Sequence, residues 1–75
     1  MPRSLSTIAV DICKTWPKIY FGAKPYVDAM LHLDTMNDMY YAENARTVVR
    51  YFLSNAGTWR GDDARRIKTE LRGML

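Results

Sequence analysis

The fold is decided by residues 45–56, ARTVVRYFLSNA. The apolar residues of this stretch recur at i, i+3, i+4, i+7, i+8 and i+11, which is the spacing of one face of an α-helix. They are Ala45, Val48, Val49, Phe52, Leu53 and Ala56. Arg46 and Arg50 fall on another face of the same helix. Gly57 follows directly, and we expect it to end the helix in the left-handed conformation that glycine adopts readily.

Two helices are expected before this stretch. The first covers residues 5–16, because apolar residues recur at helical spacing after two candidate N-cap residues, Ser4 and Ser6. Pro17 ends it, since the residue before a proline is pushed out of the α-helical region. The second covers residues 24–34 and has a proline in its first turn, where a missing amide hydrogen costs nothing.

One more helix is expected after residues 45–56. It starts around Asp62 and Asp63, acidic residues that the helix dipole favours in a first turn. Its apolar face is Ala64, Ile67 and Leu71. Residues 34–38 are predicted to form a turn with local side-chain capping, and only residues 18–21 hint at a strand. The sequence therefore predicts an all-α fold, a compact bundle of three to four short helices in one domain over residues 1–75.

The composition excludes several classes of protein. The chain is 48% hydrophobic and 12% aromatic, which is too apolar for a disordered tail. Its single cysteine, Cys13, cannot close an internal disulfide, and together with the single histidine, His32, it cannot build a zinc finger. Cys13 falls inside the first predicted helix, next to its apolar face, so we expect a buried structural side chain.

The sequence favours a cytoplasmic location. The apolar stretch after Arg3 is interrupted by polar residues, unlike a signal peptide. No apolar run approaches the ~18 residues of a membrane span. A lone free cysteine also suits a reducing compartment.

Catalytic patterns are sparse. Asp28 and His32 are four residues apart and could share a helix face and a hydrogen bond, but a surface pair is the simpler interpretation. Asp34, Asp38 and Glu43 lack the spacing of a calcium loop and are expected to be solvated. There is no glycine-rich phosphate loop. We therefore expect a protein that is not an enzyme and that uses no cofactor and no metal ion.

The basic residues are concentrated in the C-terminal part of the chain. The net charge is +3, and residues 46–75 hold seven Lys or Arg against three Asp or Glu, whereas residues 1–45 hold four against five. Arg65, Lys68 and Arg72 fall within about 60° of one another on the last helix, opposite its apolar face, and with Arg60 they form a possible basic strip. The strip could contact nucleic-acid phosphates. A solvated helix face is the preferred interpretation, because Asp62 and Asp63 would repel phosphate where a recognition helix contacts bases.

The aromatic residues exceed what so small a core can enclose, since a chain of this length has a radius of gyration of only about 11 Å. Trp16, Phe52 and Trp59 are expected in the core, and Tyr26 between core and surface. Tyr40 and Tyr41 are neighbours, so at least one should be exposed. Exposed tyrosine, methionine and arginine are typical of protein interfaces. The candidate partner-binding residues are Met36, Met39, Tyr40, Tyr41, Tyr51, Arg46 and Arg50; the alternative is that the tyrosines and methionines fill an irregular core.

Three segments carry a resemblance to a group of proteins. They are YFGAKPY at residues 20–26 with Ala29 and Met30 after it, YFLSNAGTWRG at residues 51–61, and ARRIKTEL at residues 64–71. With these segments the chain resembles small uncharacterised proteins encoded by tailed phages and prophages. The resemblance implies a non-enzymatic protein of the host cytosol that binds and inhibits or modulates a host or defence protein, as anti-CRISPR proteins do. A small nucleic-acid-binding protein and a structural or self-associating phage component are the alternatives.

Overall fold

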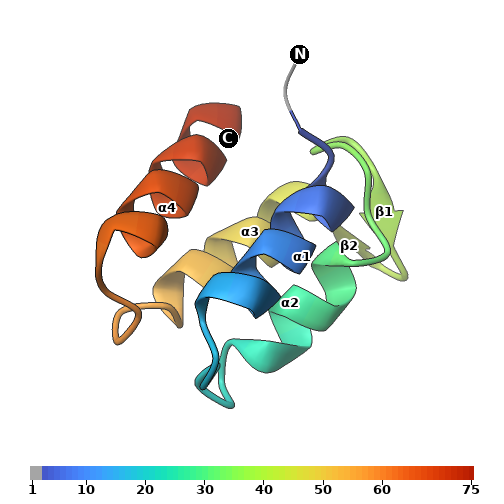
Figure 1. The fold of residues 1–75 in the computed structure, drawn as a ribbon. Helices are drawn as coiled ribbons and strands as arrows, with labels where there is room; N and C mark the ends of the chain where they lie inside the picture. The colour runs from blue at the N-terminus through green and yellow to red at the C-terminus, as the bar shows by residue number, and fades with distance from the viewer. Residues whose placement is uncertain (1–2) are drawn as a thin grey trace.

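A computed structural model describes residues 3–75, which form four helices and a two-stranded antiparallel sheet (Figure 1). In chain order the elements are α1 (Leu5–Thr15), α2 (Lys24–Met30), β1 (Met39–Tyr40), β2 (Glu43–Asn44), α3 (Ala45–Ser54) and α4 (Asp62–Met74). α1 contacts both α2 and α4, and α2 packs on α3. In Figure 1, α4 and the β1–β2 hairpin lie at opposite ends of the molecule. The prediction of a largely helical fold is confirmed, but the prediction of a purely helical bundle is wrong.

The helix starts follow local capping rules. Ser4 is the N-cap of α1, and its hydroxyl accepts a hydrogen bond from the Thr7 amide at 3.2 Å. Asn44 caps α3 in the same way, accepting from the Thr47 amide at 2.9 Å. Such a side-chain oxygen satisfies an amide that has no partner within the helix. α1 ends at Thr15, two residues before Pro17, in agreement with the predicted limit to within one residue.

α2 is shorter than predicted, because it ends at Met30 instead of residue 34. The chain leaves the helix to bond with the start of α1: the Leu5 and Ser6 amides donate to the Asp34 and Leu33 carbonyls, both at 2.9 Å. These bonds satisfy α1 amides that lack partners within their own helix. The tertiary contact therefore outweighs the local helical pattern over residues 31–34.

The turn predicted over residues 34–38 is present. The Asp38 carboxylate accepts hydrogen bonds from the Asp34 amide at 2.8 Å and the Thr35 amide at 3.0 Å. These bonds stabilise the ionised carboxylate, so the Thr35 and Asp34 amides hold the pKa of Asp38 below its usual value. The side chain of Asp38 therefore fixes the path of the chain into the hairpin.

The hairpin was not predicted. Met39 pairs with Asn44 and Tyr40 with Glu43, so each strand is only two residues long. The turn lacks the Asn-Gly or Asp-Gly pair that marks tight hairpins in sequences. Tyr41 occupies the left-handed position there, with φ of 56°. The strand hint at residues 18–21 is wrong, because those residues form no strand.

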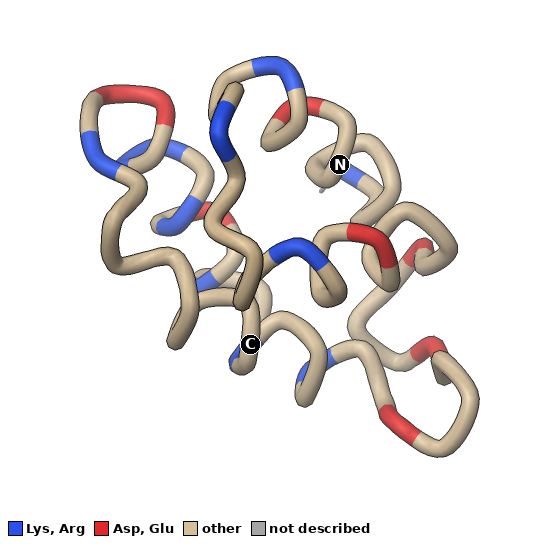
Figure 2. Tube along the Cα trace, turned by 90° about the horizontal axis from the view of Figure 1, so that it is seen from below, with Lys and Arg blue, Asp and Glu red and all other residues tan. Residues whose placement is uncertain are grey.

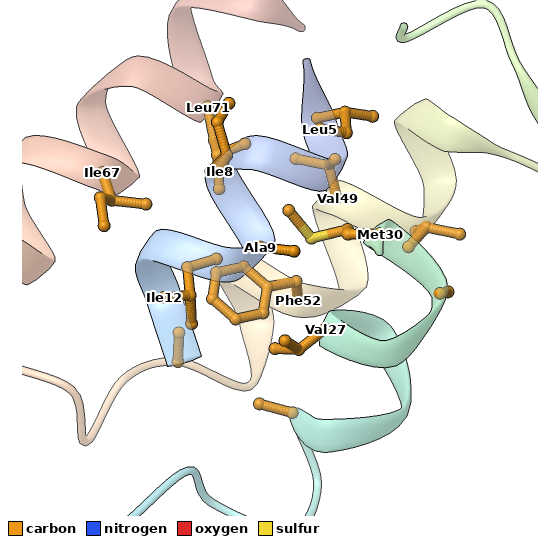
Figure 3. Packing of buried hydrophobic residues seen from close by; sticks show 14 of the residues in the cluster. Leu5, Ile8, Ala9, Ile12, Val27, Met30, Val49, Phe52, Ile67 and Leu71 are labelled. Carbon is orange, nitrogen blue, oxygen red and sulfur yellow. The ribbon is translucent and has the colours of Figure 1, made fainter. Parts of the chain in front are cut away.

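The core centres on Phe52, which is completely buried. Figure 3 shows Phe52 with Ile12 and Val27 beside it. Trp16 and Trp59 stack in parallel with ring centroids 5.1 Å apart, and Phe52 meets each of them edge-on at 6.3 and 6.4 Å. Edge-on and stacked rings are favourable aromatic geometries. The predicted core position of all three residues is confirmed, as is the half-buried position of Tyr26.

Two sequence-based expectations about single residues are wrong. Cys13 is exposed, because it lies about 100° around α1 from the buried Ile12. Gly57 does not end α3 in a left-handed conformation; Gly61 is the glycine with positive φ, at 109°. α3 ends earlier, at Ser54, where the backbone amide of Asn55 donates to the last carbonyls and its side-chain amide donates to the Tyr51 carbonyl at 2.8 Å.

An ion-pair network joins the chain start to α1 and α4. Arg3 donates to the Asp11 carboxylate at 2.9 Å and to the Glu70 carboxylate at 2.6 and 3.0 Å. Arg66 donates to Asp11 at 3.0 Å and to Asp63 at 3.1 Å. The guanidinium of Arg66, followed by that of Arg3, lowers the pKa of Asp11. The bond from Arg3 lowers the pKa of Glu70.

The lowered pKa values of Asp11 and Glu70 predict a loss of stability in acid. Above pH ~5 both carboxyls are mostly ionised in the folded and in the unfolded chain, so their stabilisation is nearly complete there. It is lost as the pH falls from that point through the lower pKa values of the folded state. Thermal unfolding followed by circular dichroism from pH 7 to pH 2 measures this loss.

The matched variant for the acid experiment is Asp11→Asn/Glu70→Gln. It should be less stable than the wild type at pH 7 and should lose less stability below pH ~4, leaving mainly the contribution of Asp38. A wild-type midpoint that stays constant down to pH 2 would contradict the prediction.

Candidate functional site

Five partly or fully exposed side chains form what we call the tyrosine surface: Tyr26, Met39, Tyr40, Tyr41 and Tyr51. They come from α2, the hairpin and α3, three elements that pack at one end of the molecule. Tyr41 is 88% exposed and Met39 61% exposed. The expectation that Tyr40 or Tyr41 lies on the surface is therefore confirmed.

Aromatic contacts order this surface. Tyr40 meets Tyr41 edge-on, with ring centroids 4.7 Å apart. The ring of His32 stacks on the ring of Tyr40, with centroids 6.1 Å apart. Tyr26 of α2 and Tyr51 of α3 are 5.5 Å apart. His32 thus supports a tyrosine ring, and it makes no hydrogen bond with Asp28 in the described part of the chain.

A small hollow of about 230 Å³ lies within the tyrosine surface. Three tyrosines, Tyr26, Tyr40 and Tyr51, line it together with Glu43. The rest of its lining is Pro25, Ala29 and Val48. Aromatic faces attract cations, so the hollow suits an apolar or positively charged side chain of a partner.

The segment that carries Tyr26 and the hairpin is acidic, although Lys24 and Arg50 lie within two residues of Tyr26 and Tyr51 in the sequence. Residues 25–45 contain Asp28, Asp34, Asp38 and Glu43 and no lysine or arginine. Figure 2 shows the same separation in space, since the end of the molecule that carries the hairpin has red positions only.

The structure does not bring the predicted basic rim to this surface. Arg46 and Arg50 lie about 140° and 100° around α3 from Tyr51, and neither lines the hollow. The basic residues of α4 lie at the other end of the molecule (Figure 1).

Met36 is also not part of the exposed surface. It is only 7% exposed and belongs to the core cluster, as does Leu33. The turn held by Asp38 returns this segment toward the core, which the local sequence does not indicate. Of the predicted methionine pair, Met39 alone is on the surface.

The predicted basic strip forms a separate hollow of about 320 Å³. Arg60, Arg65, Lys68 and Arg72 line it together with Trp59, Gly61 and Ala64. The strip does not lie opposite the apolar face of α4, as the sequence suggested, because the buried Ala64 borders the same hollow. The four basic residues are thus brought together around the edge of the core.

Sequence reasoning missed two features of the surface. Glu43 lines the tyrosine hollow, although its carboxylate was expected only to be solvated. Phe21 is 80% exposed and tilts against Tyr20 at 4.8 Å, on the connection between α1 and α2. The adjacent aromatic residues of that connection were the available signal, since neighbouring side chains of a loop cannot all point inward.

The charged residues and the helices allow two further statements about residues 3–75. No three His, Cys, Asp or Glu side chains among residues 3–75 lie close enough to share a metal ion. Within that range, none of the helices has the length and apolar character that crossing a bilayer requires. Comparisons with protein-family models, with curated proteins and with solved structures found no significant match.

Proposed function

We propose that this chain is a non-enzymatic protein that binds a partner protein through the tyrosine surface. The observation that carries the proposal is Tyr41, which combines a left-handed backbone, φ 56°, with a side chain that is 88% exposed. Tyrosine is among the residues that dominate the energetics of protein interfaces.

The cost of placing a tyrosine at this position supports a binding role. A residue other than glycine costs roughly 1–2 kcal/mol in the left-handed conformation. A ring that is mostly in water offsets little of that cost, because hydrophobic stabilisation is proportional to the apolar area removed from water. Backbone strain of this kind is concentrated at ligand-binding positions in proteins. Burial of the ring against a partner would supply the missing stabilisation.

The chemistry of the surface indicates the chemistry of the partner. The hollow is lined by three tyrosines and by Glu43, the one charged residue of its lining, and the charged residues of the segment 25–45 are all acidic. A lysine or arginine that entered the hollow would gain both a cation–π contact and charge attraction. We therefore propose a partner with an apolar patch that contains at least one exposed basic side chain.

The phage resemblance supplies a biological setting for this proposal. In that setting the chain inhibits or modulates a host or defence protein in the host cytosol, in the manner of an anti-CRISPR protein. The alternative of a structural, self-associating component makes the partner a second copy of the chain.

The decisive variant is Tyr41→Gly. Glycine adopts a positive φ without a steric cost, so folding stability should stay the same or rise by about 1 kcal/mol. Partner binding should fall about 30-fold or more, since interface hot spots contribute about 2 kcal/mol or more. The measurement is capture from a nuclease-treated bacterial lysate on the immobilised protein, with mass-spectrometric quantification of the retained partner.

Phe21→Ala is the matched control, because it removes an exposed aromatic ring outside the tyrosine surface. We expect it to retain the partner at the wild-type level. Equal capture by the wild type and Tyr41→Gly, or loss only with Phe21→Ala, would refute the proposed surface. A solution mass that falls from dimer to monomer in Tyr41→Gly would identify the partner as a second copy.

A further inference from the structure

The hollow beside α4 concentrates positive charge without a counter-charge. Four of its lining residues are basic, Arg60, Arg65, Lys68 and Arg72, and none is acidic. Its remaining lining comes from the edge of the core, Trp59, Gly61 and Ala64.

The basic residues on α4 and just before it differ in whether they form ion pairs. Arg66, on the side facing α1, is paired with Asp11 and Asp63. Among residues 3–75, Arg60, Lys68 and Arg72 form no ion pair. Arg65 has only the exposed Asp62 at 3.9 Å, and exposed pairs of that kind contribute little. Three of the four cations around the hollow therefore have no ion-pair partner among residues 3–75, and what sets them apart from other unpaired cations is that they line one hollow.

Lys68, one of the residues that line the hollow, is held in place by Trp59. Its ammonium group donates to the Trp59 carbonyl at 2.7 Å and lies 6.0 Å from the centre of the Trp59 ring. Burial lowers the pKa of Lys68, and the nearby charges of Arg72 and Arg60 lower it further. These cations repel one another, so an anion seated among them would relieve the repulsion.

We propose that this hollow binds the phosphate groups of a nucleic-acid backbone. Arg65 and Arg72 are seven residues apart on α4, which separates them by about 10 Å along the helix axis. That row extends past a single phosphate group and can contact successive phosphates of one strand. The site is distinct from the tyrosine surface, which lies at the opposite end of the molecule (Figure 1).

The same geometry argues for binding that does not depend on base sequence. Trp59 is 4% exposed and its ring stacks on Trp16, so it has little surface on which a base can stack. Asp62 and Asp63 occupy the first turn of α4, where a recognition helix would contact base edges. Phosphate contacts supply affinity and position without reading sequence.

The test is fluorescence anisotropy with labelled oligonucleotides of about 20 nucleotides, single-stranded and duplex, titrated with the full chain from ~50 to ~200 mM KCl. We expect binding whose affinity falls linearly with salt on logarithmic axes. Arg60→Gln/Arg72→Gln removes two exposed cations of the hollow, and it should reduce the salt slope by about 1.4–1.8. Tyr41→Gly should bind the oligonucleotides like the wild type, so this proposal and the proposed function can fail independently.

Arg46→Gln/Arg50→Gln is the matched control, because it removes the same charge from α3 without touching the hollow. It should retain a steeper salt slope than the variant in the hollow. Three results would overturn the proposal: no binding of either oligonucleotide at ~50 mM salt, an equal loss in the two double variants, or displacement of the oligonucleotide by an equimolar amount of inorganic phosphate. The last result would indicate a site for a small phosphate ligand instead.

Discussion

Phe52→Ala is expected to cost about 3–5 kcal/mol of folding stability, the usual penalty for removing a buried phenylalanine ring. Phe52 is fully buried and meets both tryptophans of the core edge-on. A 75-residue chain has only about 4–11 kcal/mol of stability in total. We therefore expect a midpoint of thermal unfolding at least ~12 °C below the wild type, or a chain that is unfolded at 25 °C. Circular dichroism on heating measures either result.

Phe21→Ala makes the same chemical change at an exposed position. It should change stability by no more than about 0.5 kcal/mol, as is usual for surface substitutions. A similar loss in both variants would mean that Phe52 is not the centre of the core.

Gly61→Ala is expected to destabilise the protein by about 1–3 kcal/mol through the backbone alone. Gly61 has φ 109° and ψ −177°, a combination that is accessible essentially only to glycine. A Cβ atom added there would meet no atom within 4 Å from residues other than Gly61 and its two chain neighbours, so crowding by groups from elsewhere in the fold contributes nothing. Urea unfolding measures the effect, and the far-ultraviolet spectrum of the variant should remain helical.

Gly57→Ala separates this backbone effect from the general effect of adding a methyl group. Gly57 lies four residues away, also has open space around its Cβ position, and does not have a positive φ. Alanine restricts the unfolded chain, so this variant should keep its stability or gain up to about 1 kcal/mol. Equal losses at the two glycines would contradict the assignment of the strained position to Gly61.

These two glycines also illustrate what could be predicted. The sequence places Gly57 directly after an apolar helical pattern, where a left-handed residue is common. The structure closes α3 with Asn55 instead, whose side chain and backbone satisfy the last carbonyls. Whether a helix end needs glycine depends on which other groups reach those carbonyls, and a pattern along the chain does not contain that information.

The candidate sites also show a difference between what local sequence patterns predict and what only the folded structure decides. The sequence predicted that at least one of Tyr40 and Tyr41 is exposed, from their adjacency and the small core, and the helical spacing of residues 45–56 leaves Tyr51 off the apolar face; Tyr41 and Tyr51 are both exposed. Met36 was assigned to the same surface but is buried. Met36 and Met39 are only three residues apart in the sequence, and the turn held by Asp38 decides which of the two side chains faces the core.

The sequence showed which basic residues could form a strip, but it did not show how they are arranged in space or which of them form ion pairs. The sequence predicted a strip of Arg60, Arg65, Lys68 and Arg72, and the structure adds that the four line one hollow together with Trp59 and Ala64. The sequence did not indicate that Arg3 forms an ion pair with Glu70 and that Arg66 forms one with Asp11. Those pairs join residues 55 and 67 positions apart, a distance over which sequence patterns carry no signal.

The sequence by itself determined the four helices and the Trp16, Phe52 and Trp59 core, because periodic apolar spacing and capping act between residues a few positions apart. The tertiary structure decided the early end of α2, the hairpin with its strained Tyr41, and the separation of the tyrosine surface from the basic hollow. The physical reason is the same in each case. Exposure, backbone strain and charge pairing depend on which distant elements meet, and those contacts form only when the chain folds.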